Sequence, residues 1–135
     1  MPQRFLPALA VTAALVIAGC GGSSTHSTTT SHAAAQARAT FVAQLNSVCM
    51  RANAAFAAAH THSGQVAVVS HYIHVFSSVF APAELRALYA KYLAVLEQEL
   101  AALKSGDTNA LFALAHSKAK PLAKQLGAKG CITSS

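Results

Sequence analysis

The chain has 135 residues, of which 53% are hydrophobic and 10% are charged, and its formal net charge at pH 7 is +6. About a quarter of an ordinary soluble domain is charged, and much of the hydrophobic content here is alanine, so the chain has material for one small domain with a modest core. The lysines of the C-terminal part are dispersed, without the aromatic interleaving or basic stripe of a nucleic-acid binder, and we exclude nucleic acid as a partner.

Residues 1–19 have the layout of a secretory signal peptide. Arg4 supplies a short positive region, and an apolar run from Phe5 to Ala18 follows and ends in small residues. The run is shorter than the roughly 20 apolar residues that a membrane-spanning helix needs. We therefore expect this segment to direct export and to be removed.

The segment Ile17–Cys20 (IAGC) resembles the lipobox of bacterial lipoproteins. The resemblance implies that Cys20 carries diacylglycerol, with palmitate as a typical acyl chain, and becomes the first residue of the mature lipoprotein. Two acyl chains suffice for stable membrane attachment. This interpretation places the protein on the extracytoplasmic face of the cell membrane. An ordinary cleaved signal peptide with an incidental cysteine is the alternative.

Residues 20–32 form the expected tether between the lipid and the folded domain. They are rich in Gly, Ser and Thr, and no acidic or basic residue occurs from Cys20 until Arg38. A segment of this composition cannot bury a core and is typical of a flexible linker. We therefore assign residues 33–135 to the helical domain.

Hydrophobic periodicity predicts four helices in that domain, over residues 33–61, 65–80, 82–105 and 108–126. Short turns between them favour an all-α, up-down-up-down bundle. The β-branched residues of the second segment would also suit a strand, but alternation with period two fails there. The expected apolar stripes contain Phe41, Leu45, Val48, Ala52 and Phe56; then Val66, Val69, Ile73, Phe76 and Phe80; then Leu85, Tyr89, Tyr92, Leu96, Leu100 and Leu103; then Leu111, Leu114, Ala115, Ala119, Leu122 and Leu126.

Single residues mark the ends of these helices. Ser63 is placed to cap the second helix, and Pro82 fits the first position of the third. The segment 105–107 (SGD) ends the third helix and caps the fourth, and Gly127 is a natural stop. Pro121 lies inside the fourth helix, where proline removes a hydrogen bond and favours a kink.

The cysteines predict one disulfide. If Cys20 is acylated, Cys49 and Cys131 remain as an even pair in an oxidising compartment. On the chain-entropy model a bridge across so long a loop stabilises the fold by roughly 4.5 kcal/mol. Two separate buried thiols are the alternative.

A disulfide between Cys49 and Cys131 restrains the bundle, because Cys131 follows the fourth helix whereas Cys49 lies well inside the first. Either residues 33–44 overhang as a stalk, or the tail 127–131 folds back along the first helix. Phe41 is apolar and favours contact, so we expect a folded-back tail with a kink at Pro121.

The segments Leu45–Cys49 (LNSVC), Pro82–Arg86 (PAELR) and Leu126–Cys131 (LGAKGC) are similar to segments of small alanine-rich exported lipoproteins of high-GC Gram-positive type. The similarity covers most of the mature chain. It implies a lipoprotein but no activity, because that group has no assigned one.

Histidines form the one cluster that suggests metal chemistry. His60 and His62 lie at the first turn, and His71 and His74 are one helical turn apart, a spacing at which two imidazoles can share Zn or Cu. A helical wheel places His71 and His74 opposite the apolar stripe, and no acidic residue lies nearby in sequence to support them. We therefore favour solvated surface histidines and keep the metal site as the alternative.

Catalytic arrangements are poorly represented. Glu97 and Glu99 are two residues apart and point to different faces of a helix, and the sequence has no phosphate-binding loop, nucleophile elbow or C-x-x-C motif. Tyr89 and Tyr92 are expected at the edge of the core with their hydroxyls at the surface. We expect neither an enzyme nor a cofactor.

Two functions remain. The first is a structural or interaction module at the cell envelope that presents a helical face to a protein partner. The alternative is a small-ligand or metal-binding lipoprotein that uses the bundle interior or the histidine turn. A cavity wider than alanine packing requires would favour a carrier of an apolar ligand.

Overall fold

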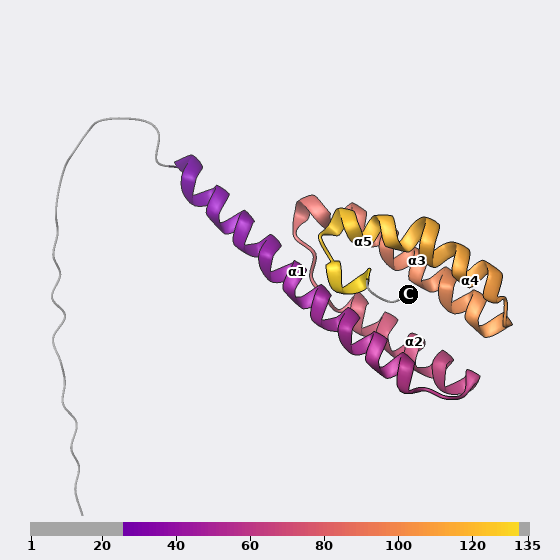
Figure 1. Cartoon of the computed structure of the whole chain (residues 1–135). Coiled ribbons are helices and arrows are strands. Elements are labelled where there is room, and N and C mark those ends of the chain that lie inside the picture. The colour runs from indigo at the N-terminus through magenta and orange to yellow at the C-terminus, as the bar shows by residue number, and fades with distance from the viewer. Residues whose placement is uncertain (1–25, 133–135) are drawn as a thin grey trace, which may run out of the picture.

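The computed structural model describes residues 26–132, and every regular element in that range is helical (Figure 1). Three elements are single α-helices: α1 (His26–Ala58), α2 (His62–Ser77) and α3 (Arg86–Ser105). The fourth helical segment consists of α4 (Thr108–Leu114), a π-helical turn η2 (Ala115–Ala119) and α5 (Lys120–Leu126). Two 3₁₀ turns, η1 (Ala83–Leu85) and η3 (Lys129–Cys131), precede α3 and follow α5. The expected all-α class with four helical segments is confirmed.

Neighbouring helices pack along one another, and the end of the chain returns to the first helix (Figure 1). α1 contacts α2, α2 contacts α3, and α3 contacts the segment from α4 to α5. η3 then packs against α1. Three of the largest side chains in the core, Phe41, Leu45 and Leu126, are at most 1% exposed. The first and last helical segments therefore share one core.

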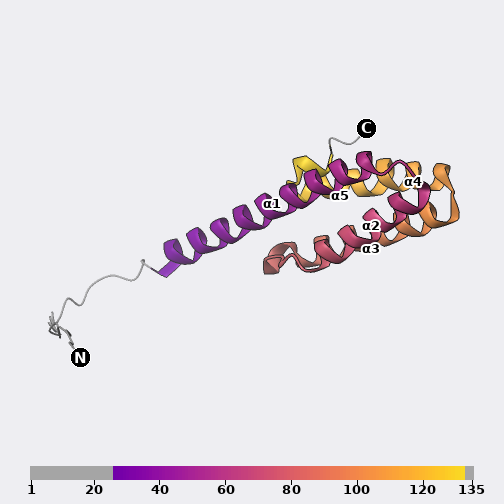
Figure 2. The same cartoon turned by 90° about the horizontal axis from the view of Figure 1, so that it is seen from below.

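The N-terminal turns of α1 extend beyond the other helices (Figure 2). α1 begins at His26, earlier than the start at residue 33 expected for the first helix. Residues 30–40 are exposed, and burial begins at Phe41. A helix nucleated by packing elsewhere extends into neighbouring residues at little cost, which explains the early start. The overhang and the folded-back tail, considered as alternatives, occur together.

The turn between α1 and α2 is capped by Thr61, not by Ser63. The backbone of Thr61 is extended, with φ −118° and ψ 149°, and its hydroxyl accepts a hydrogen bond from the Gly64 N–H at 3.1 Å. Ser63 lies within the first turn of the helix. Both residue types suit an N-cap, and the extended backbone at Thr61 decides between them.

α2 ends at Ser77, before the end of its predicted stripe. The Ser77 hydroxyl donates to the Ile73 carbonyl at 3.0 Å, a local bond of the kind that competes with regular helix continuation. Phe80 therefore lies outside the helix and is 78% exposed, 5.8 Å from the guanidinium carbon of Arg86. Pro82 precedes the η1 turn as its N-cap and does not occupy the first position of a long helix.

The other helix ends lie where the sequence predicts them. Gly106 ends α3 with φ 73°, a left-handed conformation that glycine adopts without strain. Asp107 then caps α4, with its carboxylate accepting from the Ala110 N–H at 2.9 Å. Gly127 ends α5 in the same left-handed conformation, with φ 79°.

The irregularity expected at Pro121 takes the form of the π-helical turn η2. Proline has no N–H and cannot bond the carbonyl one turn before it. A π turn shifts the hydrogen-bond partners by one residue and absorbs that loss. The segment therefore continues past Pro121 and keeps Ala119 and Leu126 buried.

Candidate functional site

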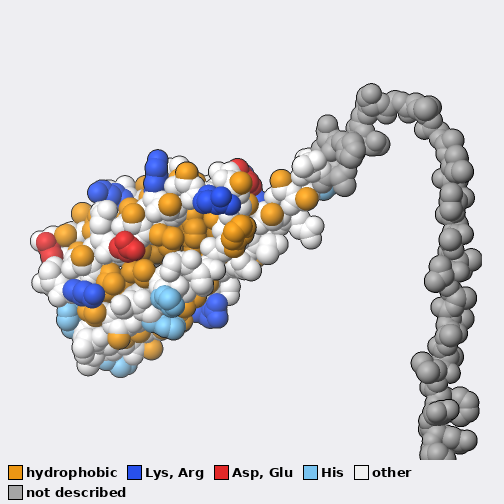
Figure 3. All heavy atoms as spheres, turned by 180° about the vertical axis from the view of Figure 1, so that it is seen from behind, with side chains coloured by type: hydrophobic (Ala, Val, Ile, Leu, Met, Phe, Trp, Pro, Cys, Tyr) orange, Lys and Arg blue, Asp and Glu red, His pale blue; other side chains and the backbone are white. Residues whose placement is uncertain are grey.

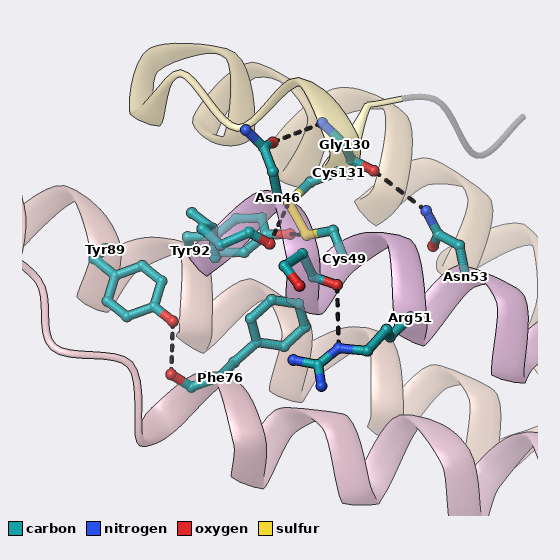
Figure 4. Close-up of a disulfide and its surroundings, with 11 residues drawn as sticks. Asn46, Cys49, Arg51, Asn53, Phe76, Tyr89, Tyr92, Gly130 and Cys131 are labelled. Atoms are coloured by element: carbon teal, nitrogen blue, oxygen red, sulfur yellow. Dashed lines mark hydrogen bonds between the residues drawn. A yellow bond between two sulfur atoms is a disulfide. The ribbon is translucent and has the colours of Figure 1, made fainter. Parts of the chain in front are cut away.

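Cys49 on α1 and Cys131 at the end of η3 lie at disulfide distance, with their Cα atoms 5.0 Å apart (Figure 4). Two hydrogen bonds secure the same contact. The Gly130 N–H donates to Asn46 Oδ1 at 2.8 Å, and Asn53 Nδ2 donates to the Gly130 carbonyl at 3.3 Å. The structure thus brings the predicted cysteine pair together and fixes the C-terminal turn on α1.

Glycine is needed at position 130 because of this close approach. A Cβ built there would lie 3.0 Å from the Asn46 carbonyl oxygen and 3.2 Å from its Oδ1. Those distances are tighter than ordinary van der Waals contacts. A side chain at Gly130 would therefore push the η3 turn away from α1.

Tyr89 and Tyr92 are buried in the core, which corrects their expected place at its edge. Each is 4% exposed. The Tyr89 hydroxyl donates to the Phe76 carbonyl at 2.6 Å, and the Tyr92 hydroxyl lies 3.9 Å from Cys49 Sγ (Figure 4). The Phe76 carbonyl at the end of α2 also accepts from the Val79 N–H at 2.9 Å and takes the hydroxyl as a second donor, so a tyrosine hydroxyl is satisfied inside the protein. Burial raises the pKa of both hydroxyls, which stay protonated at neutral pH.

A cavity of about 260 Å³ lies beside the disulfide, is lined by all four helical segments and the C-terminal turn, and is partly open to solvent. Both Cys49 and Cys131 contribute to its wall. Most of the wall is apolar, and its larger carbon side chains include Phe56, Val69, Ile73, Phe76, Leu96, Leu103, Leu111 and Ile132. An apolar cavity of about 150 Å³ is enough to hold benzene, so this space can take one ring with a short substituent.

Alanine explains why the helices leave this space. Ala52 on α1 and Ala115 and Ala119 on η2 line the cavity with single methyl groups. Protein interiors otherwise pack at the density of organic crystals, so positions of this kind would be filled by larger side chains in a solid core. The cavity is therefore wider than alanine packing requires.

Glu99 is the one acidic residue of the cavity wall. Its Oε1 atom is buried and has no hydrogen-bond partner among the described residues. Burial raises the pKa of Glu99 to about 7. A carboxylate in apolar surroundings must either take up a proton or accept a hydrogen bond. Glu99 is therefore the polar group of this cavity that calls for a partner.

Five further polar side chains border the same space: Asn53 on α1, Tyr72 on α2, Tyr92 on α3, His116 on η2 and Lys120 on α5. His116 is exposed, and its ring centroid lies 4.1 Å from that of Phe112. Lys120 is half-buried. The polar residues therefore come from different helices, as expected of a site that orients a small ligand with a few polar groups.

From the sequence, Glu99 is excluded as half of an acid–base pair, and no place in a binding site is predicted for it. Helical spacing carries a signal that could have found it, because Glu99 follows Leu96 by three residues and precedes Leu103 by four. Both leucines belong to the predicted apolar stripe. A charged residue at that spacing lies at the edge of the core.

The histidines proposed as a metal alternative are all exposed: His60, His62, His71 and His74. Between residues 26 and 132, no group of three or more His, Cys, Asp or Glu side chains is arranged to hold a metal ion. The zinc or copper site therefore stays a prediction without support from the geometry.

The signal peptide and Cys20 lie outside the described residues. Among residues 26–132, no helix combines the length and the hydropathy needed to cross a membrane. No protein-family model, no curated protein and no solved structure matches this chain. The site is therefore interpreted from its own chemistry.

Proposed function

We propose that the protein is a lipid-anchored, exported module that binds a small apolar ligand inside an up-down-up-down bundle and catalyses no reaction. The observation that carries this proposal is the cavity beside the Cys49–Cys131 pair, with its apolar wall and a volume of about 260 Å³. Ligand binding in the bundle interior is the alternative function that the sequence leaves open. The cavity makes it the preferred one.

The physical gain from a ligand lies in the unfilled space. Atoms that line a void lack contact partners on one side and lose dispersion energy. An apolar ligand restores those contacts and removes its own surface from water, at about 25 cal/mol per Å² of apolar area. A wall formed by α1, α2, α3 and η2 also covers the ligand from several sides.

An interaction module for an envelope protein is the second candidate, and exposed apolar side chains favour it. Met50, Phe80 and Phe112 are 59%, 78% and 67% exposed, respectively. Figure 3 shows hydrophobic side chains over much of one face of the molecule, with charged side chains interspersed among them. The three large residues lie on α1, on the segment after α2 and on α4. Singly exposed apolar residues are common on ordinary surfaces, so the cavity is the stronger observation.

Ethylbenzene is a suitable probe of the cavity because it consists of one ring with a short substituent. We expect isothermal titration to show saturable binding to the wild-type protein. The variant Ala52→Phe fills the cavity from α1 and should abolish the binding. Ala54→Phe is the matched control, since Ala54 lies on the same helix but is exposed and does not line the cavity.

Circular dichroism of Ala52→Phe should show the helical content of the wild type, so that lost binding reports a filled cavity. If ethylbenzene does not bind the wild type, or binds Ala52→Phe as well as Ala54→Phe, the cavity is not the binding site and the proposal is wrong.

The membrane anchor is proposed on the lipobox-like segment that ends at Cys20. We expect wild-type protein in a bacterial host to incorporate an alkyne-labelled palmitate and to partition with membranes. Cys20→Ser should lose the label and leave an uncleaved precursor or a soluble protein. Cys131→Ser should keep the label and is the matched cysteine control. Unchanged labelling of Cys20→Ser would contradict an anchor at Cys20.

A further inference from the structure

We infer that the cavity selects ligands in which a primary amine is attached to a small apolar body, and that Glu99 holds the ammonium group. This inference rests on the proposed function, because it names the class of ligand for the same cavity. It adds a recognition step that the apolar wall cannot supply, since carbon side chains do not distinguish an amine from a methyl group.

Glu99 has a side-chain oxygen that can accept a hydrogen bond and has no donor among the described residues. This residue lines the cavity, and its Oε1 atom is buried without a partner in the described part of the chain. Buried polar groups in native proteins are nearly always bonded, and an exception calls for a missing partner. Rotation about the last torsion of a glutamate is broad and exchanges its two oxygens, so either oxygen can meet a ligand. An ammonium group offers three donors in a compact volume.

The negative charge of an ionised Glu99 also favours a cationic ligand. An ionised carboxylate in apolar surroundings is costly unless an opposite charge accompanies it. A cationic ligand neutralises Glu99, whereas an anionic ligand would add a second negative charge to the same cavity. A neutral apolar ligand would leave the carboxyl oxygen without a partner.

The basic residues of the cavity wall, His116 and Lys120, do not supply a partner for Glu99. No hydrogen bond from His116 or Lys120 reaches the buried Oε1 atom. His116 is exposed and packs on the Phe112 ring, and a lysine side chain such as Lys120 can lead its charge out to water. His116 lies on η2 and Lys120 on α5, so these basic residues border the cavity from other elements than Glu99 on α3.

The pH dependence of binding follows from the carboxyl group. Burial raises the pKa of Glu99 to about 7, and an ammonium ligand binds its ionised form. Affinity for an amine should therefore increase about tenfold from pH 6 to pH 8, as the ionised fraction of such a group does. Tyr72, Tyr92, His116 and Lys120 also border the cavity, so the assignment to Glu99 needs a variant in which this carboxyl group alone is changed.

Three probes that each carry one phenyl ring with a short substituent separate these cases: benzylamine, ethylbenzene and phenylacetate. Titrated at pH 8 against the wild type, benzylamine should bind at least tenfold more tightly than phenylacetate. Glu99→Gln keeps the size of the side chain and should fold. It should weaken benzylamine at least tenfold, remove its dependence on pH, and leave ethylbenzene within twofold of its wild-type affinity.

The results distinguish this inference from the proposed function. If ethylbenzene binds and Glu99→Gln leaves benzylamine affinity unchanged, the cavity binds apolar ligands but Glu99 does not select amines, and the inference fails alone. The inference also fails if phenylacetate is the tightest of the three probes. If none of the three binds, the proposed function fails with it.

Discussion

Removal of the Cys49–Cys131 disulfide should lower the free energy of unfolding by about 4.5 kcal/mol. The two cysteines are 82 residues apart in sequence, so the bridge greatly restricts the unfolded chain. Small domains are stable by roughly 5–15 kcal/mol in total, which makes this loss a large share of the whole. We expect urea titration, followed by circular dichroism, to show the difference between wild type and the variant Cys49→Ala/Cys131→Ala.

A reducing agent provides the control for this prediction. It should destabilise the wild type and leave the double variant unchanged, because no other cysteine lies among the described residues. Equal stability of the wild type and the double variant, under oxidising conditions, would show that the predicted bridge contributes nothing. Ligand affinity should fall as well, since both cysteines form part of the cavity wall.

Glu99 should make the protein less stable as the pH rises from 5 to 8, by about 2 kcal/mol after allowance for its partial contact with solvent. Burial raises the pKa of Glu99 to about 7, from 4.5 in the unfolded chain. Between these values the folded state binds more protons than the unfolded state, so unfolding becomes easier with increasing pH. The contribution is complete below about pH 4.5 and is lost as the pH rises through 7.

Urea midpoints at pH 5 and pH 8 measure this effect. Glu99→Gln should flatten the dependence, because an amide does not ionise. Glu97→Gln is the matched control on the same helix, since Glu97 is exposed, and it should keep the wild-type slope. An identical slope in wild type and Glu99→Gln would show that this carboxyl group is not buried as described.

Local signals in the sequence were enough to predict the all-helical class and the positions of several helix ends. Two helices end at the predicted glycines, Gly106 and Gly127, and Asp107 caps α4 as predicted. A left-handed glycine or a capping carboxylate depends only on a few neighbouring residues. The buried Phe41 and Leu45 also follow the predicted stripe. Helical periodicity and the need to bury apolar residues act together at these positions.

The predictions from the sequence were wrong where contacts between helices determine the local structure. Ser63 and Thr61 are both good N-caps, and the choice depends on the backbone between two packed helices. Phe80 continues an apolar period past the end of α2, and periodicity alone does not detect that end. Tyr89 could not be placed in the core from sequence, because its hydroxyl is satisfied by a carbonyl of another helix.

The candidate site was the least predictable part. Its space arises from alanines on separate helices, and such a void depends on how the helices pack. The disulfide was predicted by counting cysteines, but its place beside the cavity was not. Glu99 was recognisable as a charge at the edge of a stripe, yet its lack of a partner appears only once the other helices surround it.

A crystal of the wild-type protein under xenon pressure tests the central claim most directly. Xenon enters dry apolar cavities and is located without ambiguity by its scattering. We predict a xenon atom in the cavity lined by Cys49, Cys131, Val69 and Leu111, and none at that place in Ala52→Phe. If the wild type shows no xenon there, the space beside the disulfide is not an apolar binding cavity.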